Sequence, residues 1–230
     1  MKIGGLQKTS LQDYPEEVSS IIWTIGCNFS CPFCYNKDLV NGNIDEIAED
    51  EIFSFLEKRR NLIDGLVISG GEPFLQKDLK EFCKKVKKIG YKIKIDTNGS
   101  YPYKLKELID EKLVDYIAMD VKAPKKKYES LTNVKTDIKK IEKSIEIIKN
   151  SDVDYEFRTT IVPNLLAKED IFDIAKWLEG AKKFFLQQFR IEPSLISPNL
   201  SKVTPYSKEE LIKILEVIKP CFEICEVRGI

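Results

Sequence analysis

The sequence predicts an α/β fold in which parallel strands form a partial (β/α)6 barrel. Apolar, strand-like runs alternate with amphipathic, helix-like segments six times along the 230 residues, and this alternation favours a parallel sheet with right-handed crossovers. Turns rich in Gly, Asn, Asp and Pro follow the strand-like runs, as loops at the carboxyl ends of barrel strands do. The length suits one domain covering residues 1–230.

The first half of the chain sets the pattern. Residues 1–17 form an N-terminal extension in which Met1–Gly5 could pair as a hairpin with the residues after it, and residues 18–24 read as a buried strand. Ile44, Ile47 and Ile52 have helical spacing, so a helix is expected over residues 43–60. The same criteria predict strands at 66–68, 91–95 and 114–119, and helices at 76–89 and 103–111.

The second half continues the alternation to the end of the chain. Helices are expected at 136–150, 168–178 and 207–218, and strands at 154–161 and 183–191. Residues 223–228 read as a last short extended piece. Because no linker or low-complexity tract interrupts the pattern, the chain is predicted to be undivided.

Composition excludes several classes of function. The 37 basic residues are balanced by 37 acidic ones, so nothing favours binding to nucleic acid or to an anionic membrane. The sequence contains neither a signal peptide nor an apolar run of about 18 residues, which predicts a cytoplasmic protein without a membrane span. In such a reducing compartment the six cysteines are expected to be ligands or buried thiols.

Three of these cysteines, Cys27, Cys31 and Cys34, are spaced C-x3-C-x2-C directly after the first predicted barrel strand. A structural zinc normally has four protein ligands, whereas three thiolates on a [4Fe–4S] cube leave one iron free for a substrate. Half of a zinc site and a redox dithiol at Cys31 and Cys34 are the alternatives. The chain has no histidine, and Cys83, Cys221 and Cys225 are interpreted as structural.

At these residues the chain resembles the radical S-adenosylmethionine (SAM) enzymes, whose signature has an aromatic residue, here Phe33, before the last cysteine. Within that superfamily it is most similar to the activating enzymes of glycyl radical enzymes, which include the pyruvate formate-lyase activating enzyme. Residues 4–15 and Tyr35-Asn36 particularly resemble the anaerobic ribonucleoside-triphosphate reductase activating proteins. The resemblance implies a radical SAM type of partial barrel, one [4Fe–4S] cluster on three cysteines, and SAM.

Further segments fall at the carboxyl ends of the next predicted strands. Gly70-Gly71-Glu72-Pro73 could be an ordinary turn, but glycines also let backbone approach a ligand closely. By resemblance it is the segment that holds the SAM amino group, with Glu72 as acceptor.

By the same resemblance, several polar residues contact SAM or a cation beside the cluster. They are Asp96, Asn98, Asp120, Lys122, Arg158 and Gln188. Asp96 and Asp120 would be near a cation, and Asp96, Asp120 and Lys122 near the SAM carboxylate. Arg158 would contact the carboxylate or the ribose, or else be an exposed strand-end residue. Gln188 would contact the ribose or adenosine.

The activity implied is reductive cleavage of SAM to a 5′-deoxyadenosyl radical, which abstracts a glycine Cα hydrogen from a partner glycyl radical enzyme. No side chain is expected to act as an acid or base, because the radical takes a hydrogen atom. Anaerobic ribonucleotide reductase is the expected partner, and a flavodoxin or ferredoxin the expected electron donor. The alternatives are a small-molecule radical SAM enzyme similar to a 7-deazaguanine precursor synthase, and a non-catalytic zinc or redox-thiol protein.

Overall fold

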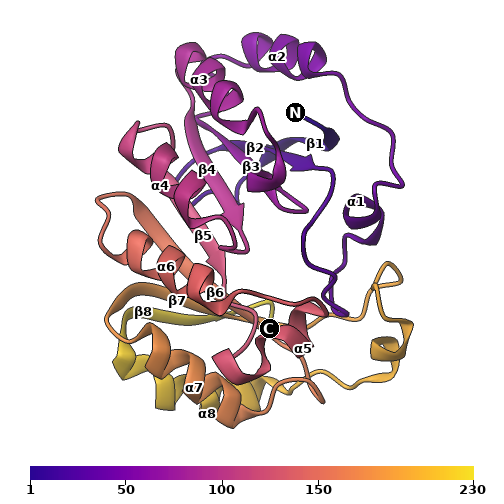
Figure 1. Cartoon of the computed structure of the whole chain (residues 1–230), viewed down its shortest axis with the longest axis vertical. Coiled ribbons are helices and arrows are strands. Elements are labelled where there is room, and N and C mark those ends of the chain that lie inside the picture. Colours follow the sequence, from indigo (N-terminus) through magenta and orange to yellow (C-terminus); the bar gives the residue numbers. More distant parts are fainter.

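The computed structural model describes residues 1–230 and contains one eight-stranded sheet, whose strands lie side by side in chain order (Figure 1). Strand β1 pairs antiparallel with β2, and every later pair is parallel. The strands are β1 (Ile3–Ser10), β2 (Ser19–Thr24), β3 (Gly65–Gly70), β4 (Lys92–Thr97), β5 (Tyr116–Asp120), β6 (Asp154–Ile161), β7 (Ala181–Gln188) and β8 (Phe222–Arg228). Because β1 and β8 do not pair with each other, the barrel is partial.

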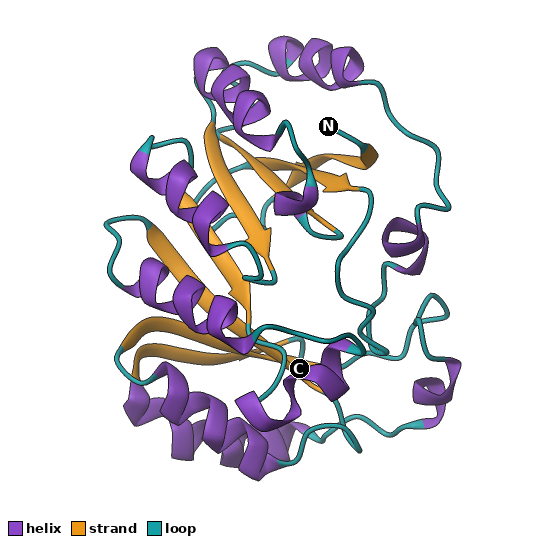
Figure 2. Cartoon of the chain, viewed as in Figure 1, coloured by secondary structure: helices purple, strands orange, loops and turns teal.

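Helices follow the strands and cover one side of the curved sheet (Figure 2). They are α1 (Lys37–Asn41), α2 (Glu49–Lys58), α3 (Leu79–Ile89), α4 (Pro102–Asp110), α5 (Tyr128–Thr132), α6 (Ile138–Lys149), α7 (Lys168–Leu178) and α8 (Lys208–Ile218). The longer helices pack there because each buries an apolar stripe. In α3 this stripe consists of Leu79, Phe82, Cys83 and Val86, which have helical spacing. No helix has both the length and the apolar character needed to cross a bilayer.

The two faces of the sheet have different chemistry. The face under the helices belongs to a core cluster of 51 buried residues, to which β4 contributes Ile93 and Ile95. On the opposite, inner face, the buried apolar residues include a small cluster of Tyr14, Ile21, Val67 and Tyr116. Side chains alternate along a strand, so the positions next to Ile93 and Ile95 place Lys94 and Asp96 on the inner face. Charged groups therefore line the inside of the barrel.

The α/β architecture agrees with the sequence prediction, including six strand-then-helix units from β2 to α8. One predicted helix is wrong in extent. Residues 43–48 are not helical, because the Ile47 N–H donates to the Ile3 carbonyl at 2.7 Å and Ile47 pairs with β1. The extended piece near the C-terminus is a full parallel strand, β8, paired with β7.

Candidate active site

A cavity of about 420 Å³ lies at the carboxyl ends of the parallel strands, and the three cysteines of the C-x3-C-x2-C motif line it. We call it the cysteine cavity. Its wall also includes residues from five strands or the loops that follow them: Gly70 and Gly71, Asp96 and Asn98, Asp120 and Lys122, Arg158, and Gln187. The fold thus brings together segments that are more than a hundred residues apart in the chain.

The cysteine loop is held in place from three directions. The Gly26 N–H donates to the Leu39 carbonyl at 2.8 Å, and the Ser30 N–H donates to the Thr132 carbonyl of α5 at 2.9 Å. On the far side, the Ile196 N–H donates to the Cys34 carbonyl at 3.1 Å. Sequence reasoning assigned no supporting role to α5 or to the segment around Ile196. Such backbone contacts leave no signature in side-chain identity.

The three cysteines suit an iron–sulfur cluster. The sulfurs of Cys27 and Cys34 each accept a backbone N–H, from Phe29 and Asn36, at 3.4 Å, a type of bond that tunes cluster potentials. Three thiolates would bind three irons of a [4Fe–4S] cube and leave the fourth free for a substrate. Burial raises the pKa of the Cys27 thiol to about 12, and bound metal is what deprotonates such a thiol.

Two glycines bring the loop after β3 against the cysteine loop. A Cβ on Gly71 would lie 1.9 Å from the Gly26 carbonyl oxygen, and Gly70 has a φ of +117°, which side-chain-bearing residues rarely adopt. Because neither glycine has a side chain, the two loops can approach closely enough for two backbone hydrogen bonds. The Gly71 N–H donates to the Thr24 carbonyl at 3.0 Å, and the Glu72 N–H donates to the Gly26 carbonyl at 2.9 Å. Both glycines line the cysteine cavity.

Glu72 and Pro73 are buried and are not among the residues that line the cavity. The Glu72 carboxylate instead accepts hydrogen bonds from Phe74 N–H at 3.1 Å, Thr97 Oγ1 at 2.8 Å and Asn98 N–H at 2.7 Å. Burial raises its pKa to about 7 in spite of these donors. In this arrangement the side chain joins the loops after β3 and β4 and does not face a ligand. Acceptance of the SAM amine by this side chain stays a prediction.

A charged network on the inner face contains four of the predicted residues. Arg158 has a side chain only 12% exposed and lies between two carboxylates, with its Nε 2.9 Å from Asp120 and an Nη 3.6 Å from Asp96. Lys122 Nζ contacts Asp120 at 3.0 Å. The alternative of an exposed, strand-end Arg158 is therefore wrong. The neighbouring cations lower the pKa of both carboxylates in spite of burial.

Sequence reasoning missed Lys94, whose buried Nζ contacts Asp96 at 2.6 Å. The sequence could have indicated this pair, because Lys94 and Asp96 are two residues apart at the end of a predicted strand and so share a face. It also missed Asn28, whose Oδ1 accepts a bond from Asn98 Nδ2 at 2.9 Å. Asn98 Nδ2 is in turn 3.9 Å from the Cys27 sulfur, so Asn98 lies beside the cysteine loop, and its contact with SAM or a cation stays a prediction.

Gln188 does not line the cysteine cavity, and its neighbour Gln187 does. The Gln188 Nε2 donates instead to the Tyr206 carbonyl. The strand prediction was too long at its end, since β7 stops at Gln188. A contact between Gln188 and SAM within this cavity is thus not supported by the side-chain position.

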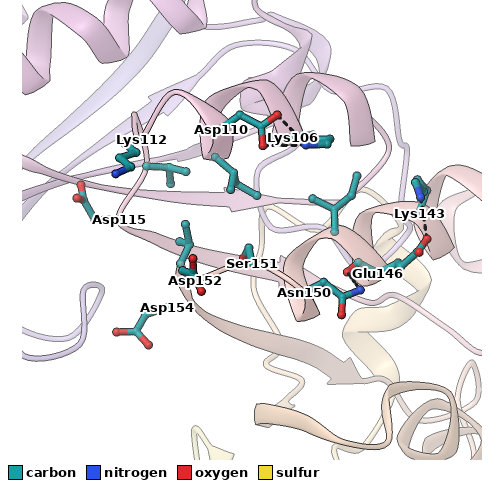
Figure 3. Close-up of a pocket in the computed structure, with 14 residues that line it drawn as sticks. Lys106, Asp110, Lys112, Asp115, Lys143, Glu146, Asn150, Ser151, Asp152 and Asp154 are labelled. Carbon is teal, nitrogen blue, oxygen red and sulfur yellow. Dashed lines mark hydrogen bonds and ion pairs between the residues drawn. The ribbon is translucent and has the colours of Figure 1, made fainter.

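A larger cavity of about 730 Å³ lies between α4 and α6, near the amino ends of β5 and β6. Figure 3 shows its rim of Lys106, Asp110, Lys143, Glu146 and other polar side chains. Lys106 pairs with Asp110, and Lys143 with Glu146. This cavity contains no cysteine, and active sites of barrels of this kind lie at the opposite end of the strands. We therefore take the cysteine cavity as the candidate active site.

The chain is similar in sequence to two kinds of known protein. A candidate glycyl-radical enzyme activating enzyme of Methanocaldococcus jannaschii is 38% identical over 99% of this chain and 96% of its own length. A 7-carboxy-7-deazaguanine synthase of Methanospirillum hungatei is 30% identical over 64% of this chain and 59% of its own length.

Among solved structures, Streptococcus suis SuiB bound to S-adenosylmethionine has a similar fold, with a TM-score of 0.68 at 15% identity. The match covers 91% of this chain and 50% of that one, so this chain spans about half the length of SuiB. The model of the radical SAM superfamily matches residues 21–179, which include the cysteine loop and the strands β2 to β6. The chain belongs to the radical SAM superfamily and is a radical SAM enzyme, a family that implies a [4Fe–4S] cluster and SAM.

Proposed function

We propose that this enzyme activates a glycyl radical enzyme by removing a hydrogen atom from a glycine Cα of that partner. The observation that carries the proposal is the near full-length match to a candidate activating enzyme, together with the cysteine cavity at the barrel rim. Anaerobic ribonucleotide reductase is the partner that we propose, on the resemblance of residues 4–15 and Tyr35-Asn36. A flavodoxin or ferredoxin is the proposed electron donor.

Cys27, Cys31 and Cys34 would hold the cluster. When bound, the cluster and SAM supply one-electron cleavage of the S–C5′ bond, which yields methionine and a 5′-deoxyadenosyl radical. The chain itself supplies position and exclusion of water.

The charged network suits the methionyl end of SAM. Arg158 and Lys122 lie in the wall of the cysteine cavity and carry cationic groups that could attract the SAM carboxylate. Backbone groups of Gly70 and Gly71 are open to the cavity, and we propose that they contact the amino group. Asp96 and Asp120 hold Arg158 in place. The metal cation predicted near these two aspartates remains a prediction, and Lys94, Lys122 and Arg158 already supply positive charge there.

A second candidate function is chemistry on a small molecule. The 30% identity to a 7-carboxy-7-deazaguanine synthase favours it, but that match covers only 64% of this chain. The longer and closer match to an activating enzyme favours the protein substrate.

The test is electron paramagnetic resonance (EPR) of the anaerobically reconstituted enzyme with reductant, SAM and the anaerobic ribonucleotide reductase of the same organism. The proposal expects a glycyl radical doublet on the reductase, with one methionine formed per radical. Replacing the target glycine by alanine should abolish the signal. Consumption of a pterin substrate with no radical on the reductase would favour the second function.

A further inference from the structure

A second cavity of about 430 Å³ adjoins the cysteine cavity. Tyr35, Asn36, Thr160 and Gln187 line both, so the two cavities share a wall. We call the second one the rim cavity. It lies at the carboxyl ends of β6, β7 and β8, where Arg228 and Gly229 complete its lining. A ligand in the rim cavity would therefore lie next to whatever occupies the cysteine cavity.

Three of the ten residues that line the rim cavity have amide side chains. Asn36, Gln187 and Gln188 line it, and the Gln188 Oε1 is a shielded acceptor with no hydrogen-bond partner in the protein. The amides of Asn36 and Gln187 make no hydrogen bond within the chain, so each keeps a donor and an acceptor available. A peptide group also has one donor and one acceptor. The lining therefore matches peptide backbone.

The charges of the rim cavity do not favour an anion. The Arg228 guanidinium is already paired with both oxygens of the buried Glu156 carboxylate, at 2.8 and 3.0 Å. The other charged residues in the lining are one cation, Arg190, and one anion, Glu192. A phosphate or polycarboxylate site would present surplus cations, so the rim cavity suits a neutral ligand.

The sheet edge adds a second argument for a peptide. Strand β8 is the last strand of the sheet and pairs only with β7. Its end, Arg228 with the following Gly229, lines the rim cavity. The outer edge of such a strand has N–H and C=O groups without a strand partner, which an extended peptide can pair with.

We propose that the rim cavity binds a neutral, extended peptide segment, and that Gln187, at the shared wall, contacts a peptide group beside the target glycine. This inference rests on the proposed function, since that function supplies a glycine-bearing segment as the occupant. It adds the residues that recognise the segment and the chemistry by which they do so.

The experiment measures binding without chemistry. The probe is the capped, neutral peptide acetyl-Ala-Ser-Gly-Ser-Ala-amide, titrated into the cluster-loaded enzyme with SAM but without reductant, and followed by saturation-transfer NMR. Gln187→Met keeps the side-chain length but removes both hydrogen-bonding atoms, so affinity should fall about three- to tenfold. Gln12→Met, at an exposed position outside both cavities, should bind the peptide as the parent enzyme does.

An acidic peptide and an Arg190 variant test whether the rim cavity is an anion site instead. The same peptide with Glu in place of both Ser residues should bind no more tightly, and Arg190→Gln should change affinity for the neutral peptide less than twofold. Tighter binding of the acidic peptide, lost in Arg190→Gln, would overturn the inference, as would equal peptide affinity in Gln187→Met and the parent. Failure of this inference is distinguishable from failure of the proposed function, because a radical could form on the partner while the peptide fails to bind here.

Discussion

Cys27, Cys31 and Cys34 should differ from the other three cysteines in what their loss does. Replacement of any one of them by Ser should abolish the cluster, because these three are the cysteines that line the cysteine cavity and no other could take the place of the lost ligand. Cys221→Ser is the matched control, since Cys221 is a half-buried thiol away from that cavity. Iron content and the visible spectrum after anaerobic reconstitution give the answer. Loss of the cluster in Cys221→Ser with retention in Cys27→Ser would reverse the assignment.

Glu72 should make stability depend on pH. Burial raises its pKa from 4.5 to about 7, so between these values the folded state binds more protons than the unfolded state does. Its contribution to the free energy of unfolding must then fall as the pH rises through that range. Glu72→Gln cannot titrate and should lack this contribution. Urea unfolding of both proteins at pH 5 and pH 7.5 measures this change in the free energy of unfolding. An equal pH dependence in the two proteins would show that Glu72 ionises normally.

The contact between the loop after β3 and the cysteine loop can be tested through Gly71. In Gly71→Ala the new Cβ would meet the Gly26 carbonyl oxygen, which must move the backbone next to Cys27. We expect cluster occupancy to fall at least twofold and SAM affinity about tenfold or more, a loss of roughly 1.4 kcal/mol. Gly90→Ala is the control, because Gly90 has a positive φ, which Gly71 does not, yet no atom lies within 4 Å of the new Cβ. Normal cluster loading in Gly71→Ala would contradict the close-packing argument.

Strands β4, β5 and β6 are joined on the inner face through Arg158. Arg158→Met would remove the cation that Asp96 and Asp120 share, although Lys94 and Lys122 would still pair with these partly buried carboxylates. It should lower the free energy of unfolding by roughly 1.5–3 kcal/mol. Arg60→Met removes an exposed pair with Glu57 and should cost less than about 1 kcal/mol. Denaturant titration compares the two. Similar small losses would mean that the network does not stabilise the sheet.

At the scale of elements, the sequence predicts those helices and strands whose bounds are marked by a regular apolar spacing or by turn residues. Helix α7 has the predicted bounds because a regular apolar stripe defines it, and the strand ends coincide with turn residues. The start of α2 was not predictable, because Ile44 and Ile47 fit a helical pattern while long-range pairing with β1 decides the backbone. The hydrogen bonds that Glu72 accepts from Thr97 and Asn98 were not predictable for a similar reason, since these donors lie 25 and 26 positions away in the chain.

For the whole molecule, the order of strands follows from the chain order, so the sequence could place the cysteine loop, Gly70, Asp96 and Asp120 at one rim. It could not show how the rim divides into two cavities. That division depends on the loop between β7 and α8, whose backbone binds the cysteine loop at Cys34 and Pro32. Backbone contacts of this kind do not depend strongly on residue type, so the rim cavity emerges only from the structure.

The measurement that tests the central proposal most directly follows the hydrogen atom itself. The partner reductase is produced with glycine deuterated at Cα and incubated anaerobically with the enzyme, SAM and reductant, and the 5′-deoxyadenosine is analysed by mass spectrometry. Direct abstraction predicts one deuterium in each 5′-deoxyadenosine formed with a radical, and collapse of the glycyl EPR doublet to a near singlet. Unlabelled 5′-deoxyadenosine, formed at the same rate with or without the partner, would contradict glycyl radical activation.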